Sequence, residues 1–205
     1  MPLLFWRLDP PLLAISSAPL GGGIGERRWV LNATVPMSYS RNDPDVHLGE
    51  LARGLGLDGP GVGLLTGVDV ADRVRHADGG AVAWATVGLS AAILAAAPAE
   101  AAPAHFGTIN IVASVPARLS EAALVNAVAT ATEAKAQALI ELGLTATGTM
   151  TDAVCVLCPA GGPAEPYGGP RSTWGARLAR AVHGAVLAGG TACLAGAVPW
   201  SQRRG

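Results

Sequence analysis

The chain has 205 residues, of which 50% are hydrophobic and 14% are charged, and its formal net charge is −1. This composition excludes an intrinsically disordered chain, and the length fits one domain with a sizeable core. A net charge so close to zero gives no indication of binding to nucleic acid or to an anionic membrane. Three cysteines, an odd and low number, do not indicate a secreted disulfide scaffold.

The N-terminal apolar run lacks a basic flank and is interrupted by Asp9, Pro10 and Pro11. We therefore expect no signal peptide and a cytoplasmic protein. The uncharged segment 81–99 is long enough to cross a bilayer, but it is mostly alanine and lacks basic flanks. A buried strand followed by an alanine-rich turn or short helix is the better interpretation.

Short apolar or alternating runs bounded by Gly and Pro predict strands in chain order at 3–8, 12–18, 28–35, 62–66, 81–89, 107–115 and 152–158. Helices are predicted at 45–55, 120–143 and 174–188, and the polar segment 69–76 fits a single helical turn. Strands that follow one another without helices favour antiparallel pairing. We therefore expect an α+β fold, a single-domain layered sandwich with a mixed, largely antiparallel sheet and packed helices. The domain would cover 1–200, with a frayed tail at 201–205.

The predicted helix 120–143 carries a lysine within its apolar face. A turn of 100° per residue places Lys135 near the middle of a stripe formed by Leu124, Val128, Ala131, Ala138 and Leu142. A buried ammonium group is costly unless it is paired. Lys135 therefore either reaches the rim, pairs with a core carboxylate, or points into a site between helix and sheet. The opposite, polar stripe is formed by Asn126, Thr130, Glu133 and Gln137.

The segment GTMTD (148–152) places two hydroxyls and a carboxylate before a buried strand. Thr149, Thr151 and Asp152 are plausible site residues at that position. Without other information, a turn in which these side chains cap the loop is the favoured interpretation.

Several familiar motifs are absent or incomplete. The glycine-rich run 21–25 is followed by no Lys-Ser/Thr pair, and no GxSxG sequence occurs. Cys155 and Cys158 have CxxC spacing, but on a strand this separation points them to opposite faces. The histidines show no ligand spacing, so we expect no protein-bound metal and no resident cofactor.

Seven blocks carry a resemblance to a known family: SSAPLGGG (16–23), VLNATVP (30–36), VGLLTGVDV (62–70), TVGLS (86–90), GTINIV (107–112), ALVNAVATATEAKAQAL (123–139) and TGTMTDAV (147–154). In this order they resemble the adenosylcobinamide amidohydrolases of corrinoid salvage. The resemblance implies hydrolysis of the amide that joins aminopropanol to the corrin ring, giving adenosylcobyric acid. It also implies a corrinoid substrate that carries its own cobalt. The alanine-rich segment 91–105 departs from the polar or basic segment usual in the family.

For this reaction we expect Asp152 or Glu133 to activate water, while Lys135 stabilises the oxyanion or protonates the amine. On a regular helix Glu133 and Lys135 point about 160° apart, which favours Asp152. In a rival mechanism Thr149 or Thr151 is the nucleophile and Lys135 is its base. Polar residues expected to bind substrate are Asn32, Thr66, Asp69, Thr108, Asn110 and Asn126.

Three tryptophans, Trp29, Trp84 and Trp174, either stack on the ligand or pack in the core. We expect no nucleic acid or membrane partner, and self-association is left open. A corrinoid-binding module without activity and an amidohydrolase of another small amide are the alternative functions.

Overall fold

The computed structural model describes residues 1–98 and 107–196. Its elements are β1 (Leu3–Ser16), β2 (Gly23–Thr34), α1 (Pro44–Gly54), β3 (Gly61–Thr66), the 3₁₀ turn η1 (Val70–Asp72), β4 (Val74–Asp78), β5 (Ala81–Val87), β6 (Ile109–Ser114), α2 (Glu121–Glu141), β7 (Ala153–Pro159) and α3 (Thr173–Leu194). The strands form a sheet in the order β3-β2-β1-β7-β6-β5-β4. The pairs β2–β3 and β6–β7 are parallel and the others antiparallel, so the predicted mixed α+β arrangement is confirmed.

Strand β1 bends the sheet. It pairs with β2 along both of its halves, but with β7 only over 12–16. The register shifts between Arg7 and Leu12, across the Pro-Pro break that contains a cis Asp9–Pro10 peptide. The prediction of two separate strands at 3–8 and 12–18 was wrong, because the prolines interrupt the pairing register without ending the strand.

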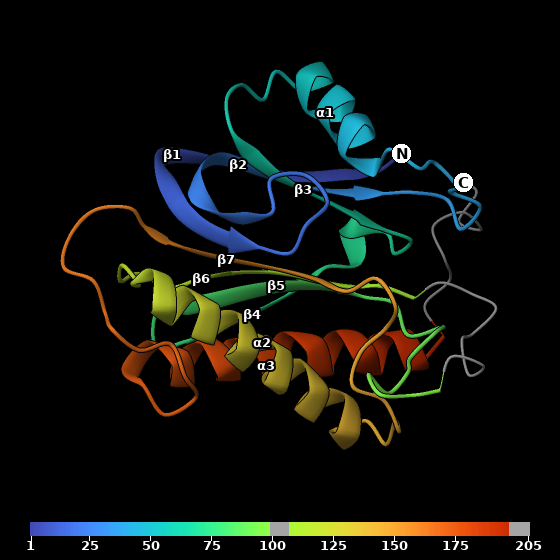
Figure 1. The fold of residues 1–205 in the computed structure, drawn as a ribbon. Coiled ribbons are helices and arrows are strands. Elements are labelled where there is room, and N and C mark those ends of the chain that lie inside the picture. The colour runs from blue at the N-terminus through green and yellow to red at the C-terminus, as the bar shows by residue number, and fades with distance from the viewer. Residues whose placement is uncertain (99–106, 197–205) are drawn as a thin grey trace.

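As a result, the β1–β3 part of the sheet lies over the β5–β7 part. The rings of Trp6 on β1 and Trp84 on β5 are 5.5 Å apart, although these strands are not neighbours in the sheet. Figure 1 shows the resulting layers, with α1 outside β1–β3 and the helices α2 and α3 on the far side of β4–β7. The cleft described below opens at the ends of these two facing layers.

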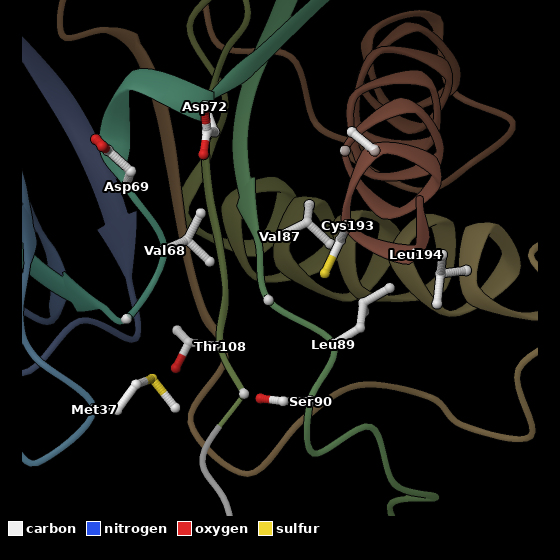
Figure 2. Close-up of a pocket in the computed structure, with 15 residues that line it drawn as sticks. Met37, Val68, Asp69, Asp72, Val87, Leu89, Ser90, Thr108, Cys193 and Leu194 are labelled. Atoms are coloured by element: carbon white, nitrogen blue, oxygen red, sulfur yellow. The ribbon is translucent and has the colours of Figure 1, made fainter. Parts of the chain in front are cut away.

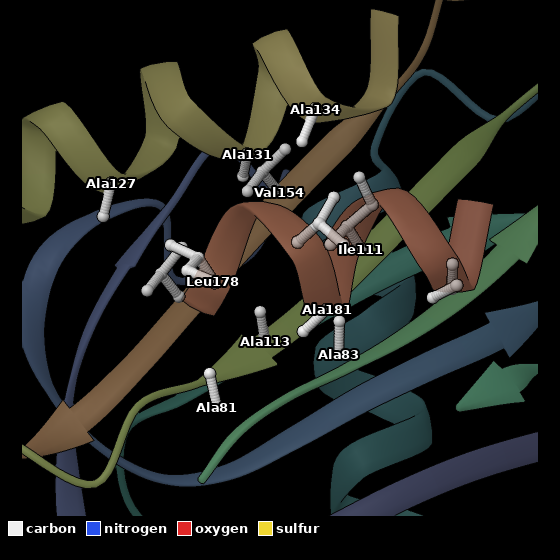
Figure 3. Close-up of a cluster of buried hydrophobic side chains, with 14 of the residues drawn as sticks. Ala81, Ala83, Ile111, Ala113, Ala127, Ala131, Ala134, Val154, Leu178 and Ala181 are labelled. Atoms are coloured by element: carbon white, nitrogen blue, oxygen red, sulfur yellow. The ribbon is translucent and has the colours of Figure 1, made fainter. Parts of the chain in front are cut away.

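The largest buried cluster lies between β5–β7 and the helices α2 and α3 (Figure 3). Many of its members are alanines, including Ala83 and Ala113 on the sheet and Ala127, Ala131 and Ala181 on the helices. Small side chains let helix and sheet backbones approach closely, so a chain with few aromatic residues builds this core largely from alanine and branched aliphatic side chains. A second cluster fills the space between the two parts of the sheet, and a third lies under α1.

Helix α2 begins as predicted, with the Ser120 hydroxyl accepting a hydrogen bond from Ala123 N at 3.2 Å. The prediction that Thr130 belongs to a solvated stripe was wrong, because it is only 2% exposed and donates to Gly168 O at 2.9 Å. The loop that contains Gly168 covers this side of α2 so closely that a Cβ on Gly168 would lie 2.0 Å from Ala123 O.

The segment 69–76 is more than one helical turn. It contains η1 and also β4, which forms a hairpin with β5 through Gly79 and Gly80. These glycines have φ values of 51° and 96°, the left-handed region that a two-residue hairpin turn requires. In the segment 81–99, residues 81–87 form β5, and no helix among the described residues is long and apolar enough to span a membrane. Residues 99–106, which include the end of the alanine-rich segment 91–105, and residues 197–205, which include the predicted tail 201–205, lie outside the described residues.

Candidate active site

Two adjoining cavities open where the two layers of the sheet end. The larger, of about 450 Å³, is called the α3 cavity because the last turn of α3 forms one wall. Figure 2 shows Asp69 and Asp72 of η1 on one side of it, and Cys193 of α3 on another. The smaller, of about 310 Å³, is called the proline cavity and is lined in part by Pro19, Pro36 and Pro44. Met37, Gly67 and Thr108 line both cavities, so they form one continuous cleft.

A pair of hydroxyls lies where the cavities meet. Thr108 precedes β6 and Thr151 precedes β7, and their Oγ1 atoms are 2.6 Å apart. They meet because β6 and β7 are parallel neighbours, with Asn110 opposite Ala153. Thr151 Oγ1 also lies 3.0 Å from Gly107 O, and either of the two hydroxyls can donate to the other. This pair is therefore in place to meet a bound substrate.

Behind the hydroxyl pair lies a buried ion pair. Lys135 Nζ is 2.5 Å from Asp152 Oδ2, and the two side chains are 8% and 9% exposed. Asp152 also accepts from the backbone N–H groups of Ile109 at 2.9 Å and Thr149 at 3.0 Å. The Thr149 hydroxyl lies 2.5 Å from Asp152 Oδ1 and 2.7 Å from Gly107 O. The ion pair thus ties α2, the start of β6 and the loop before β7 together.

The ion pair leaves no room for a side chain at Gly148. A Cβ there would lie 2.5 Å from both Lys135 Nζ and Asp152 Oδ2. Neither Lys135 nor Asp152 lines the two cavities. Of the interpretations of Lys135 that the sequence left open, pairing with a core carboxylate is the one observed.

A second polar network crosses between the facing layers. The Asn110 side-chain amide on β6 donates to Asn32 Oδ1 on β2 at 3.0 Å and to Leu65 O on β3 at 2.8 Å. Asn32 in turn donates to the Thr86 hydroxyl on β5 at 3.2 Å. The side-chain oxygen of Asn110 is buried and has no hydrogen-bond partner among residues 1–98 and 107–196, yet this residue lines the proline cavity.

The predicted site residues fall into three groups. The cleft is lined by Thr66, Asp69, Thr108, Asn110 and Thr151. Lys135, Thr149, Asp152 and Asn32 lie behind it and contact these lining residues or their neighbouring backbone. Glu133 and Asn126 are exposed on α2 and line neither cavity. Asp69 also caps η1 by accepting from Ala71 N at 2.9 Å.

The three tryptophans line neither cavity. Trp29 belongs to the core under α1 and donates to Gly59 O at 3.1 Å. Trp84 packs on Trp6, and Trp174 lies beneath the guanidinium of Arg177 at 4.7 Å. Packing is therefore the role observed for these residues.

Tyr39 is a cleft residue that the sequence reasoning missed. It lines the proline cavity, stacks on His47 of α1 and has its hydroxyl 3.1 Å from His47 Nδ1. Burial is the main cause that raises the pKa of Tyr39, so its hydroxyl stays protonated at neutral pH. No motif spacing along the chain marks a tyrosine that lies beside a later helix, so this residue carried no signal in the sequence.

Within residues 1–98 and 107–196, no three His, Cys, Asp or Glu side chains gather closely enough to hold one metal ion. Cys155 and Cys158 lie in different buried clusters, on opposite faces of the sheet as predicted. Burial raises the pKa of the Cys155 thiol to about 12. The thiol is therefore neutral and fills space in the core.

Comparison with known proteins adds the decisive observation. The family model described as adenosylcobinamide amidohydrolase matches residues 1–196. The chain belongs to this family. A protein named adenosylcobinamide amidohydrolase from Methanosarcina mazei is 36% identical over 182 residues, which cover 84% of this chain and 88% of that relative. A protein of the same name from Halobacterium salinarum is 42% identical over 132 residues, covering 61% of this chain and 56% of that relative.

The residues of this chain that match the adenosylcobinamide amidohydrolase family contain every element that builds the cleft, from β1 to the end of α3. The resemblance inferred from the seven sequence blocks is confirmed. Three of these blocks, 62–70, 86–90 and 107–112, contribute lining residues to the α3 cavity. The blocks 123–139 and 147–154 supply the Lys135–Asp152 ion pair.

Proposed function

We propose that this chain hydrolyses the amide between aminopropanol and the corrin ring of adenosylcobinamide, releasing adenosylcobyric acid and aminopropanol. The match to the adenosylcobinamide amidohydrolase family over residues 1–196 carries this proposal. The cleft supports it, because amide hydrolysis requires a nucleophile that substrate can reach, and the Thr108–Thr151 pair provides hydroxyls there. Cavities of about 450 and 310 Å³ suit an amide-bearing arm of the corrinoid, with the ring placed at the mouth of the cleft.

The hydroxyl geometry favours a threonine as the nucleophile. Thr151 Oγ1 attacks the amide carbon and loses its proton to Thr108, which passes its own proton to the leaving nitrogen. The C–N bond breaks, aminopropanol leaves, and the acyl group remains as an ester on Thr151. Water then attacks the ester, its proton returns through Thr108 to Thr151, and the carboxylic acid product is released.

Lys135 and Asp152 act in this mechanism as positioning residues. Asp152 already accepts hydrogen bonds from Lys135, Ile109 and Thr149, and the ion pair is more than nine-tenths buried. Lys135 lines neither cavity and is bonded to Asp152, so it takes no proton from Thr151 in this mechanism. The pair instead fixes the loop that carries Thr151 against the start of β6, where Thr108 lies.

Turnover is the test of the proposed function. Purified protein is incubated with adenosylcobinamide, with and without a chelator, and adenosylcobyric acid is measured by mass spectrometry. Product in both samples supports the proposal and the prediction that no resident metal is needed, whereas chelator-sensitive product overturns the metal-free chemistry. Binding of the corrinoid without product would instead identify a binding module, and neither binding nor product would indicate another amide substrate.

Other expectations stay predictions. These are the cytoplasmic location, the absence of a nucleic acid partner, and self-association, which remains open. The alanine-rich segment 91–105 takes the place of the polar segment usual in the family, and its second half, 99–105, lies outside the described residues.

A further inference from the structure

The side-chain oxygen of Asn110 is an acceptor without a partner in the wall of the cleft. Asn110 is 1% exposed and its Oδ1 atom has no hydrogen bond, although the residue lines the proline cavity. Burying an acceptor without a partner disfavours folding, so such a group is typical of a place that a ligand completes.

The orientation of this amide is fixed by its neighbours. Its Nδ2 group donates to Asn32 Oδ1 and to Leu65 O. Turning the amide over would set Oδ1 against Leu65 O, a carbonyl that can only accept, so the orientation is fixed whichever way Asn32 is turned. The unpartnered atom is therefore an acceptor, and its ligand partner must be a donor.

The position of Asn110 relative to the reacting hydroxyls limits which donor it meets. Asn110 follows Thr108 by two residues on the same face of the chain, a spacing of about 6–7 Å along a strand. In an amide attacked at the Thr108–Thr151 pair, the hydroxyl oxygen of an extended aminopropanol lies about 5 Å from the attacked carbon, so it comes within hydrogen-bond reach of a side chain two residues along the strand. The neighbouring cavity walls include Val35, Pro36 and Leu65, which suit the methyl group.

We propose that the proline cavity holds the amine part of the substrate and that Asn110 Oδ1 accepts a hydrogen bond from the hydroxyl of that amine. Asn110 is then a specificity-determining residue, and its network to Asn32 and Thr86 positions it. This inference rests on the proposed amide hydrolysis and adds which end of the scissile bond enters which cavity.

A pair of substrates tests the inference in the wild-type protein. One is adenosylcobinamide, and the other is the same corrinoid amide made with isobutylamine, in which a methyl group replaces the hydroxyl at nearly equal volume. The expected kcat/KM of the isobutyl amide is lower by about tenfold or more, because the acceptor stays unpaired. Equal turnover of both amides would overturn the assignment of Asn110 and leave the proposed function intact, whereas turnover of neither would overturn both.

Two variants test whether Asn110 is the residue that distinguishes the two amides. Asn110→Leu is expected to bring the ratio of kcat/KM values for the two amides to within about threefold of one, since no acceptor then distinguishes them. Gln137→Leu makes a similar amide-to-leucine change on the exposed face of α2, and the substrate ratio should stay at the wild-type value. An Asn110→Leu protein that keeps the wild-type preference would contradict the inference. If this variant does not fold, the wild-type comparison alone decides.

Discussion

Two buried polar networks support the cleft, and they differ in charge and completeness. The first is the ion pair of Lys135 and Asp152, whose carboxylate accepts hydrogen bonds from α2, from the start of β6 and from the loop before β7. The second joins Asn32, Thr86 and Asn110 across the facing layers, is uncharged, and leaves Asn110 Oδ1 without a partner. The complete network lies behind the cleft, while the incomplete one lines it.

This difference indicates that the first network has a structural role and that the second contributes to ligand binding. Buried charges persist only when paired and hydrogen-bonded, so a complete ionic network is suited to holding a loop in one place. A neutral group can be buried with one acceptor unpaired at a tolerable cost, and that acceptor remains for the substrate. We therefore expect changes in the ionic network to alter stability most, and changes at the cleft to alter turnover most.

The largest effect on stability is expected from Asp152→Asn. This change leaves the buried Lys135 ammonium opposite a neutral amide, and removing one partner of a buried pair destabilises by about 3–5 kcal/mol. Lys135→Met should cost less, because Asp152 keeps its donors from Ile109 and Thr149.

Urea unfolding of the two single variants and the double variant measures this coupling. The double variant is expected to lose less free energy of unfolding than the sum of the single losses. Single losses below about 1 kcal/mol would show that the ion pair does not hold the loop.

Thr151→Val should have the largest effect on turnover. Valine has the shape of threonine without the hydroxyl, so kcat should fall by about 100-fold or more with little change in the melting temperature. Thr151→Ser keeps the hydroxyl and should retain much of the activity. A Thr151→Val enzyme with wild-type kcat would remove Thr151 from the mechanism.

Gly148→Ala tests how tightly the ionic network is packed. The added Cβ would lie 2.5 Å from Lys135 Nζ and Asp152 Oδ2, so we expect a loss of about 1–3 kcal/mol in the free energy of unfolding. Gly49→Ala is the matched control, because a Cβ at Gly49 in α1 meets nothing within 4 Å and alanine favours a helix by up to about 1 kcal/mol. Equal stabilities for the two variants would contradict the packing at Gly148.

The smallest effect is expected at an exposed, hydrogen-bonded carboxylate. Glu141 accepts hydrogen bonds from Gln137 at 2.8 Å and has His183 Nε2 at 2.8 Å, and these contacts lower the pKa of Glu141. A lowered pKa stabilises the folded state above the unfolded pKa, and this contribution is lost as pH falls through the folded pKa. The melting temperature of Glu141→Gln should be slightly below wild type at pH 7, and the difference should vanish in acid. A difference that grows in acid would contradict this sign.

Local patterns were sufficient for most of the fold. Alternation and caps predicted α2 and the strands near it, and periodicity placed Lys135 on the buried face of α2. The failures came from tertiary neighbours. Thr130 is buried because a loop 38 residues later covers it, and β1 continues through its prolines because β2 pairs on both sides of them.

For the candidate site, the sequence identified several of the residues but not how they are arranged in space. Thr108, Thr151 and Asn110 were named as candidates, but the meeting of Thr108 with Thr151 depends on the parallel pairing of β6 with β7. The orientation of the Asn110 amide, which leaves its oxygen without a partner, is set by Asn32 and Leu65. These residues lie on strands that are not neighbours of β6. No pattern along the chain encodes such contacts between facing layers.

The pairing of β1 with β7 has a consequence during synthesis. Strand β1 is made before its partner β7, and 136 residues separate Ser16 from Ala153. At about 5–20 residues per second, a ribosome takes roughly 7–27 s to add this intervening chain. Throughout that interval the 12–16 edge of β1 exposes unpaired backbone groups that a neighbouring nascent chain can bind, so polysomes are where this protein is most prone to aggregate.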